Sequence, residues 1–196
     1  MLRGLVDRFD NAVDGLVAPL RGRPPVDAGA ALASALGDHG LVWFLIGVSR
    51  RRRPGPGRAR AMRAVAFTGA VTPAVNRILK QAVARSRPPR PPGSVVAVRV
   101  PRTASFPSGH ALAAWCAATP VAEGDRSAPL YYRAAAAVSY SRVHVQLHHA
   151  SDVVAGSALG VGLGLLGRRL LPPGGTVMRR LGAPGMPRAR PRLTPL

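Results

Sequence analysis

Apolar residues recur at helical spacing along most of this chain, and polar or proline-rich breaks divide them into segments. In residues 1–25 the apolar positions alternate with charged ones at the spacing of an amphipathic helix. This stretch is too charged to cross a bilayer and lacks the small-residue cleavage site of a signal peptide. We therefore expect a helix that lies on a membrane surface or packs on the rest of the protein, and that ends at Pro24 and Pro25.

Further apolar segments follow. Residues 28–48 are long enough for one span of about 20 residues, but Asp38 and His39 are costly against lipid, so a short helix, a break and a second piece fit equally well. Four more apolar helices are predicted at about 60–80, 108–122, 129–147 and 152–167. The proline-rich residues 85–107 predict a loop with one short extended piece at 95–100, and the Pro/Gly/Arg-rich residues 172–196 predict a disordered tail.

Charge narrows the class of protein. The chain has 28 Lys+Arg against 8 Asp+Glu, a formal net charge of +20. Such an excess suits nucleic acid, an anionic membrane surface, or the cytoplasmic loops of a membrane protein. The arginines flank the apolar segments, and only 5% of residues are aromatic, so stacking on nucleic acid is the weaker interpretation. The single cysteine, Cys116, cannot form an internal disulfide and lies in an apolar run.

Membrane topology follows from the same pattern. No segment is an uninterrupted run of 18 apolar residues, so a soluble, alanine-rich helical bundle is the alternative. If residues 50–63, 123–126 and 168 onward are cytoplasmic, every polar cluster described below falls on the opposite, extracytoplasmic face. Arg21 and Arg23 do not fit this arrangement. We predict an all-α integral-membrane bundle with about five spanning helices, six being compatible with the sequence, and the N-terminal amphipathic helix beside it.

Two clusters of polar residues lie where predicted helices meet the proline-rich loop. Lys80 and Arg87 can neutralise an anion, unless they only snorkel at a helix terminus. Ser108 has the position of a helix N-cap, and the backbone N–H groups of Gly109 and His110 would point beyond the helix start. His110 would be placed to give a proton to a departing oxygen, although an ordinary capped helix explains the same residues.

The third cluster precedes the last apolar segment. Arg142 can bind a phosphate through its planar guanidinium group. His148 and Asp152 are four residues apart, so on one helical turn the carboxylate can fix the imidazole tautomer, which suits a nucleophile or base. Ser151 is expected to cap the helix that Asp152 begins.

A metal site is the strongest alternative for this third cluster. His144 lies four residues before His148, and His149 and Asp152 are close by. A metal would leave the other two clusters without a common purpose, whereas several cations and a helix N-terminus already supply charge stabilisation for phosphoryl transfer. We therefore expect neither a metal nor another cofactor.

Taken in order, the three clusters form a pattern that resembles the tripartite signature of the type 2 phosphatidic acid phosphatase family. The pattern is Lys80 with six residues before Arg87-Pro88, then Pro107-Ser108-Gly109-His110, then Ser141-Arg142 with five residues before His148 and three more before Asp152. The family includes lipid phosphate phosphatases, undecaprenyl-diphosphate phosphatases and, more distantly, vanadium haloperoxidases. The resemblance covers about residues 60–170, within an expected membrane domain at 26–171.

The resemblance implies a metal-independent phosphatase that acts through a phosphohistidine. His148 would attack phosphorus, Asp152 would orient it, and His110 would protonate the leaving oxygen and later activate water. The implied phosphate ligands are Lys80, Arg87, Ser108, Gly109 and Arg142. The implied substrate is a lipid-linked phosphate or diphosphate, on a polyprenyl carrier or a glycerophospholipid, in a bacterial plasma membrane.

The sequence departs from the family pattern at three positions. Many bacterial members have aromatic residues near the positions of His144 and His149, and a glycine near Gln146. These departures leave the pocket and the substrate open. A non-catalytic basic membrane- or nucleic-acid-binding helical protein and a vanadate-dependent oxidase are the alternative functions. The first would lose binding gradually with salt and release no phosphate, and the second would oxidise halide when vanadate is added.

Overall fold

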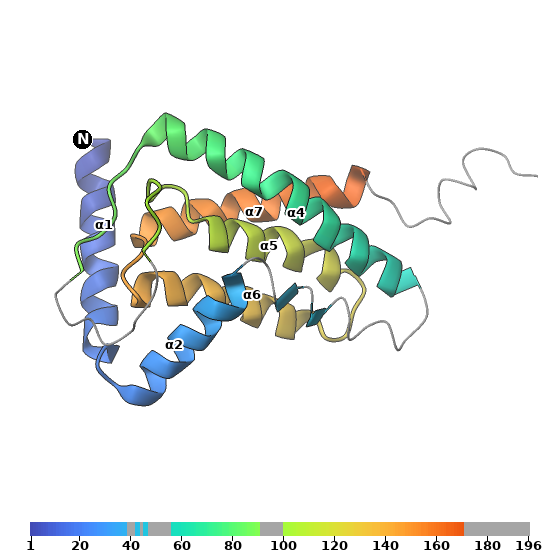
Figure 1. Ribbon diagram of the computed structural model, residues 1–196, viewed down its shortest axis with the longest axis horizontal. Coiled ribbons are helices and arrows are strands. Elements are labelled where there is room, and N and C mark those ends of the chain that lie inside the picture. The colour runs from blue at the N-terminus through green and yellow to red at the C-terminus, as the bar shows by residue number, and fades with distance from the viewer. Residues whose placement is uncertain (39–41, 44, 47–55, 91–99, 171–196) are drawn as a thin grey trace, which may run out of the picture.

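The structure, a computed structural model, describes residues 1–38, 42–43, 45–46, 56–90 and 100–170, and within these ranges all regular structure is helical (Figure 1). The expected all-α fold is confirmed for this part of the chain. Of the possible extended piece at 95–100, residues 95–99 lie outside the described residues, as does the tail at 172–196. The helices are α1 (Leu2–Val17), the 3₁₀ turn η1 (Ala18–Leu20), α2 (Pro24–Gly37), α4 (Pro56–Val83), α5 (Gly109–Ala122), α6 (Ala128–His144) and α7 (Ala150–Leu170).

The first two helices differ in detail from the expectation. The amphipathic helix ends at Val17, and Pro24 and Pro25 begin α2 instead of ending α1. Proline suits the first turn of a helix because its missing N–H has no partner there in any case. After Gly37 the chain leaves the helical conformation at Asp38, and short helical pieces follow at 42–43 and 45–46. The extended backbone at Asp38 favours the broken alternative, although residues 39–41, 44 and 47–48 lie outside the described residues.

Helix α5 lies at the centre, between α7, α6 and α4 (Figure 1). Six of its 14 residues are alanine, and ten of the 14 are buried. Glycines along α7 allow the two backbones to come close: a Cβ on Gly156 would lie 2.5 Å from the backbone oxygen of Ser108, and one on Gly160 would lie 2.4 Å from that of Leu112. The α5–α7 contact therefore depends on the absence of side chains at these positions.

Adding a methyl group at Gly160 is expected to destabilise the fold by about 1–3 kcal/mol, because the new Cβ would overlap backbone atoms that cannot rotate away. Gly162→Ala is the matched control, since a Cβ there meets nothing within 4 Å, and alanine favours a helix by about 1 kcal/mol over glycine. Thermal unfolding in detergent should show a lower Tm for Gly160→Ala and an equal or higher Tm for Gly162→Ala. Equal melting of the two variants would contradict the close packing.

All three polar clusters gather at one end of the bundle, beside α1. The last turn of α4, the first turn of α5 and the loop between α6 and α7 meet there (Figure 1). The turn at 123–127 and the end of α7 lie at the opposite end, where Arg168 forms a 2.6 Å ion pair with Glu123. The arrangement agrees with the alternating chain direction that the sequence predicts.

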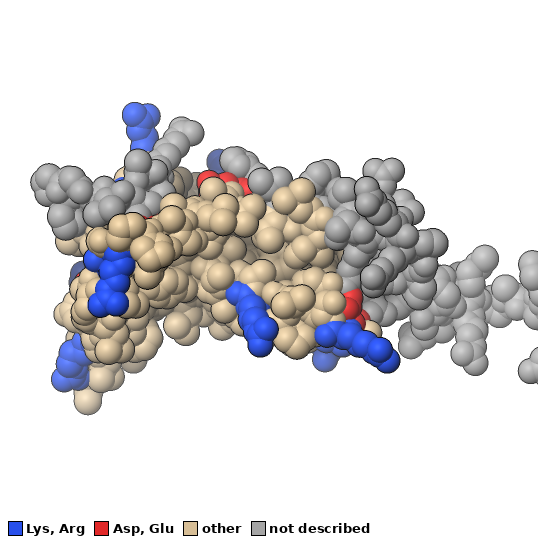
Figure 2. Space-filling model, turned by 90° about the horizontal axis from the view of Figure 1, so that it is seen from below, with Lys and Arg blue, Asp and Glu red and all other residues tan. Residues whose placement is uncertain are grey.

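Within the described residues, α7 is the only helix that is long and apolar enough to cross a membrane, with 21 residues and a mean hydropathy of 1.5. Helix α5, with 14 residues, rises only about 21 Å, less than the roughly 30 Å of a bilayer core. Large apolar side chains are nevertheless exposed along the bundle, at Ile78, Leu130, Val154, Leu159, Leu165, Leu166 and Leu170. Figure 2 shows a face formed largely by uncharged residues, on which charged groups are few. The number of spanning helices stays a prediction.

Candidate active site

The two nitrogens of His148 face different partners. This side chain is only 3% exposed and lies in the loop at 145–149, between α6 and α7. Its Nε2 is 3.4 Å from the guanidinium NH1 of Arg87, and its Nδ1 is 3.4 Å from the hydroxyl of Ser105. The same Arg87 nitrogen donates to the carbonyl oxygen of Leu147 at 2.6 Å, which holds the arginine against the loop. Nε2 is therefore the ring nitrogen on the side of the cations.

Asp152 is fully buried in the first turn of α7 and faces His148 at ion-pair distance. Its Oδ2 lies 3.8 Å from Nδ1 of His148, too far for a hydrogen bond. The Ser105 hydroxyl donates to the same carboxylate oxygen at 2.5 Å, as does the backbone N–H of His149 at 2.9 Å. The sequence-predicted carboxylate–imidazole pair is thus bridged by a serine that the motifs do not contain.

The other oxygen of Asp152 connects the site to α1. Arg85 donates to Oδ1 of Asp152 at 2.8 Å and to Oδ2 of Asp10 at 2.7 Å, and Asp10 is itself buried. The backbone N–H and the hydroxyl of Ser151 also donate to Asp10, at 2.7 and 2.8 Å. The expectation that Ser151 caps α7 is therefore wrong: the helix begins at Ala150, and Ser151 instead holds the N-terminal helix.

Two further cations of the motifs, Lys80 and Arg142, are held by hydrogen bonds to neighbouring residues. The ammonium group of Lys80 donates to the carbonyl oxygen of Ala104, and NH1 of Arg142 donates to the hydroxyl of Ser34. Among the described residues, Nε of Arg142 and the hydroxyl of Ser108 are buried without a hydrogen-bond partner. Buried polar groups are rarely left unpaired in native proteins, so both donors are able to bind a group that the described residues do not supply.

Ser108 precedes α5 as expected, but its hydroxyl makes no capping hydrogen bond. Its backbone N–H instead donates to the backbone oxygen of Asp152 at 3.0 Å, so the second and third motifs are joined directly. The next residue, Gly109, lies against α4, where a Cβ would come within 2.9 Å of the side-chain nitrogen of Asn76. The glycine lets the start of α5 approach the end of α4 and its Lys80.

His110 and His144 each face a carboxylate of the α2 segment. Nε2 of His110 lies 2.6 Å from Oδ1 of Asp38, and Nε2 of His144 lies 2.7 Å from Oδ1 of Asp27. The second ring nitrogen of His144 is 3.0 Å from the hydroxyl of Tyr140. His144 is thus a buried residue with both ring nitrogens occupied by Asp27 and Tyr140. In the described ranges no three His, Cys, Asp or Glu side chains gather in a way that would hold a metal ion.

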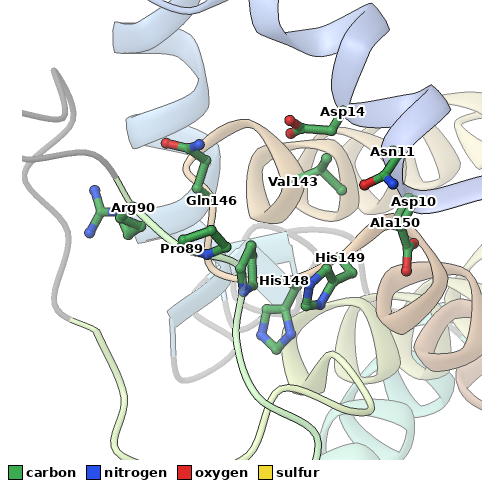
Figure 3. A pocket seen from close by; sticks show the side chains of 11 residues that line it. Asp10, Asn11, Asp14, Pro89, Arg90, Val143, Gln146, His148, His149 and Ala150 are labelled. Atoms are coloured by element: carbon green, nitrogen blue, oxygen red, sulfur yellow. The ribbon is translucent and has the colours of Figure 1, made fainter. Parts of the chain in front are cut away.

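A pocket of about 480 Å³ adjoins His148 on the side of α1 (Figure 3). Asn11 and Asp14 of α1 line it, together with Gln146 and His149 of the loop. Gln146 has a positive φ of 54°, a conformation that glycine adopts far more readily. Two of the three departures from the expected family pattern therefore line one pocket beside the candidate nucleophile.

Comparison with known proteins adds to this geometry. A sequence profile described as the PAP2 superfamily matches residues 61–173, more than half of the chain, and includes all three motifs. The chain belongs to the PAP2 superfamily. The resemblance to the type 2 phosphatidic acid phosphatase family that the motifs indicate is therefore confirmed.

Two relatives of this PAP2 protein are named phosphatases. It is 30% identical over 147 residues to a decaprenylphosphoryl-5-phosphoribose phosphatase of Mycolicibacterium smegmatis, covering 75% of this chain and 80% of the relative. It is 32% identical over 151 residues to the enzyme of that name from Mycobacterium tuberculosis, covering 74% and 80%. The protein is accordingly a phosphatase of this superfamily.

Solved structures agree on the fold. A transmembrane PAP2-type phosphatidylglycerolphosphate phosphatase from Bacillus subtilis superposes with a TM-score of 0.66 at 22% identity, over 85% of this chain and 86% of that one. LpxE from Aquifex aeolicus gives 0.65 at 20% identity, over 81% and 93%. At these identities the likeness concerns the PAP2 fold alone.

Sequence reasoning missed several residues of the PAP2 site. Ser105, Arg85, Asp10 and Asp38 contact motif residues but belong to none of the three motifs. One signal was available in the sequence. Ionisable residues in apolar membrane segments mark functional sites by default, and Asp38 stands in such a segment.

Proposed function

We propose that this PAP2 protein removes the terminal phosphate from a polyprenyl-linked phosphosugar at the extracytoplasmic face of a bacterial plasma membrane. The single observation that carries the substrate class is the similarity, over three quarters of the chain, to phosphatases named for decaprenylphosphoryl-5-phosphoribose. Such a substrate is a polyprenyl carrier with a phosphomonoester at its polar end, one of the two lipid classes that the sequence motifs imply.

In the proposed reaction Nε2 of His148 attacks phosphorus and the bond from phosphorus to the leaving oxygen breaks. His110 gives that oxygen a proton, so the sugar leaves as a neutral alcohol. His110 then takes a proton from a water molecule, which attacks the phosphohistidine and releases inorganic phosphate. The direction of Nε2 towards Arg87, and of Nδ1 towards Ser105 and Asp152, supports this assignment.

The phosphate oxygens would be held by cations and by the start of α5. The unpartnered Nε of Arg142 and hydroxyl of Ser108 support this role, because both are buried donors without another described partner. Positive groups fixed in advance around the phosphate stabilise the charge of the transition state without a metal ion. The proposed phosphate ligands are Lys80, Arg87, Ser108, Gly109 and Arg142.

The membrane arrangement belongs to the same proposal. About five helices cross the bilayer, and α1 lies at its surface. The exposed apolar residues Leu2, Leu5, Phe9 and Leu16 support this position, because at helical spacing they form one face of α1. Asp10 and Val17 are buried on a neighbouring face, so α1 would contact the protein and the lipid with different sides.

The test is phosphate release by the purified protein from four lipids. Polyprenylphosphoryl-5-phosphoribose is expected to give the highest kcat/KM, ahead of polyprenyl diphosphate, phosphatidate and phosphatidylglycerophosphate. Activity should persist in a metal chelator, because the cations of the protein supply the charge stabilisation. Preference for a glycerophospholipid would contradict the substrate class, and complete loss with chelator would contradict the metal-independent mechanism.

Activity should be lost only at a lower pH than the ordinary pKa of a histidine would predict. Burial is the main reason why the pKa of His148 falls to about 4, compared with about 6.5 for an ordinary histidine. The nearby Asp152 carboxylate, which favours the charged imidazolium, opposes that lowering of the pKa. Three nearby positive charges lower the same pKa further, those of Arg87, Arg142 and Lys80.

Only neutral imidazole can attack phosphorus, so activity should persist below pH 6 and be lost as the pH falls through about 4. The measurement is kcat/KM against pH. The second ionisation of the substrate phosphate, near pH 6, is determined separately by ³¹P NMR and divided out. An enzyme limb close to pH 6.5 would contradict the buried, neutral state of His148.

A further inference from the structure

One side of α2 carries a row of polar residues. Asp27, Ser34 and Asp38 are separated by seven and four residues, so they lie along a single stripe of the helix and its C-cap. The rest of α2 is small and mostly apolar. Each residue of the stripe contacts a polar group at the active-site end: Asp27 contacts His144, Ser34 contacts Arg142, and Asp38 contacts His110.

The last member of this stripe meets the residue proposed as the acid. Nε2 of His110 lies 2.6 Å from Oδ1 of Asp38, a short hydrogen-bonded pair. The backbone before Asp38 also touches the imidazole, because a Cβ on Gly37 would come within 3.0 Å of Cδ2 of His110. The end of α2 therefore restrains the ring both by packing and by a hydrogen bond.

The Asp38–His110 pair differs from the His148–Asp152 pair in its charged neighbours and in its exposure to solvent. Asp38 also interacts electrostatically with Arg142, one of the proposed phosphate ligands. Its side chain is 55% exposed and that of His110 is 22% exposed, whereas His148 and Asp152 are almost completely buried. A carboxylate hydrogen-bonded at this distance fixes the orientation of the ring, and a partly exposed pair can exchange a proton with water.

We propose that Asp38 is the positioning residue of His110, so that the site contains two separate carboxylate–imidazole arrangements with opposite tasks. The proposal rests on the proposed role of His110 as the acid. Nε2–H of His110 donates to Asp38, which turns Nδ1–H towards the leaving oxygen. In the first step that proton moves from Nδ1 to the oxygen as the phosphorus–oxygen bond breaks. In the second step Nδ1 recovers a proton from the attacking water.

Substrates that differ in their need for a proton test this role. The leaving group of an alkyl phosphate is a strongly basic alkoxide, which needs a proton in order to depart. The leaving group of a nitrophenyl phosphate is a weakly basic nitrophenolate, which departs without a proton. The value of kcat/KM reports phosphoenzyme formation, the step that needs the acid. Asp38→Asn is expected to lower kcat/KM for the alkyl substrate about 10- to 100-fold, and to lower it for the aryl substrate much less. Asp38→Glu should recover part of the loss.

Two further variants separate this role from a structural one. Asp27→Asn makes the same chemical change in the same stripe but faces His144, so it should not alter the ratio between the two substrates. A double variant with His110→Ala should be no worse on the alkyl substrate than His110→Ala alone, because Asp38 acts through that ring.

Equal losses on both substrates in Asp38→Asn, or additive losses in the double variant, would overturn the proposed role of Asp38. If His110→Ala itself shows no dependence on the leaving group, the assignment of His110 as the acid fails instead. The two failures are therefore distinguishable. Thermal unfolding of each variant shows whether a loss of activity reflects loss of the fold.

Discussion

Replacing His148 by alanine is expected to lower phosphate release about 10⁴-fold or more, because covalent catalysis loses its nucleophile. The side chain is buried, with its Nε2 towards Arg87, so no neighbouring histidine can take its place without moving the loop. The measurement combines steady-state phosphate release with rapid quenching of enzyme mixed with ³²P-labelled substrate. Wild-type protein should carry label that is stable in alkali and labile in acid, as expected of a phosphohistidine, and His148→Ala should carry none.

The adjacent histidine provides the control for this experiment. His149 is also in the loop, and its Nδ1 lies 3.3 Å from Asp152. Its ring lines the pocket near α1, so His149→Ala should retain the labelled intermediate and lose activity by a smaller factor. A labelled intermediate that persists in His148→Ala would exclude His148 as the nucleophile.

Converting Asp152 to asparagine is expected to lower phosphoenzyme formation about 10³- to 10⁴-fold, in the range found when an orienting carboxylate is replaced elsewhere. Its oxygens accept hydrogen bonds from Arg85, Ser105 and the backbone of His149. An amide supplies only one acceptor oxygen, so Ser105 would lose its anchor or Arg85 would face an N–H₂ group. Single-turnover kinetics measure the effect on chemistry.

Ser105→Ala distinguishes the two ways in which Asp152 can act. If the carboxylate orients His148 through the serine hydroxyl, Ser105→Ala should cost about 10-fold or more and should change Asp152→Asn little further. If the carboxylate acts directly by its charge, the serine variant should retain nearly full activity. A fully active Asp152→Asn protein would contradict both.

A structural feature of this protein can be predicted from the sequence when the residues that form it are close together in the chain. The motif residues were identified because they are close in sequence and occur in a fixed order, and the matched PAP2 region contains them all. The helices were predicted because apolar periodicity is a local property. The spacing of His148 and Asp152 predicts that the two side chains face each other, and they lie 3.8 Å apart. Spacing does not predict the Ser105 hydroxyl between them, nor that α7 begins only at Ala150.

Residues that contact the motifs from other elements could not be found in this way. Asp10 reaches the site across 141 positions of sequence to Ser151, and Asp38 reaches His110 across 72. Neither pairing leaves a periodic or local signal. They depend on tertiary packing, which decides whether an aspartate on an amphipathic helix faces water or the protein.

The glycines of α7 limit which parts of this enzyme can vary in sequence without loss of activity. With backbone against backbone, α5 and α7 have one fixed register, and the 3.0 Å contact from Ser108 N–H to the Asp152 carbonyl depends on it. A slip of one residue along α7, about 1.5 Å, would break that contact. It would also shift Asp152, which faces His148, relative to the proposed phosphate ligands at the start of α5. Adaptation to new lipids would therefore be confined to α1, α2 and the loops, while the α5–α7 pair stays constant as the rigid frame of the chemistry.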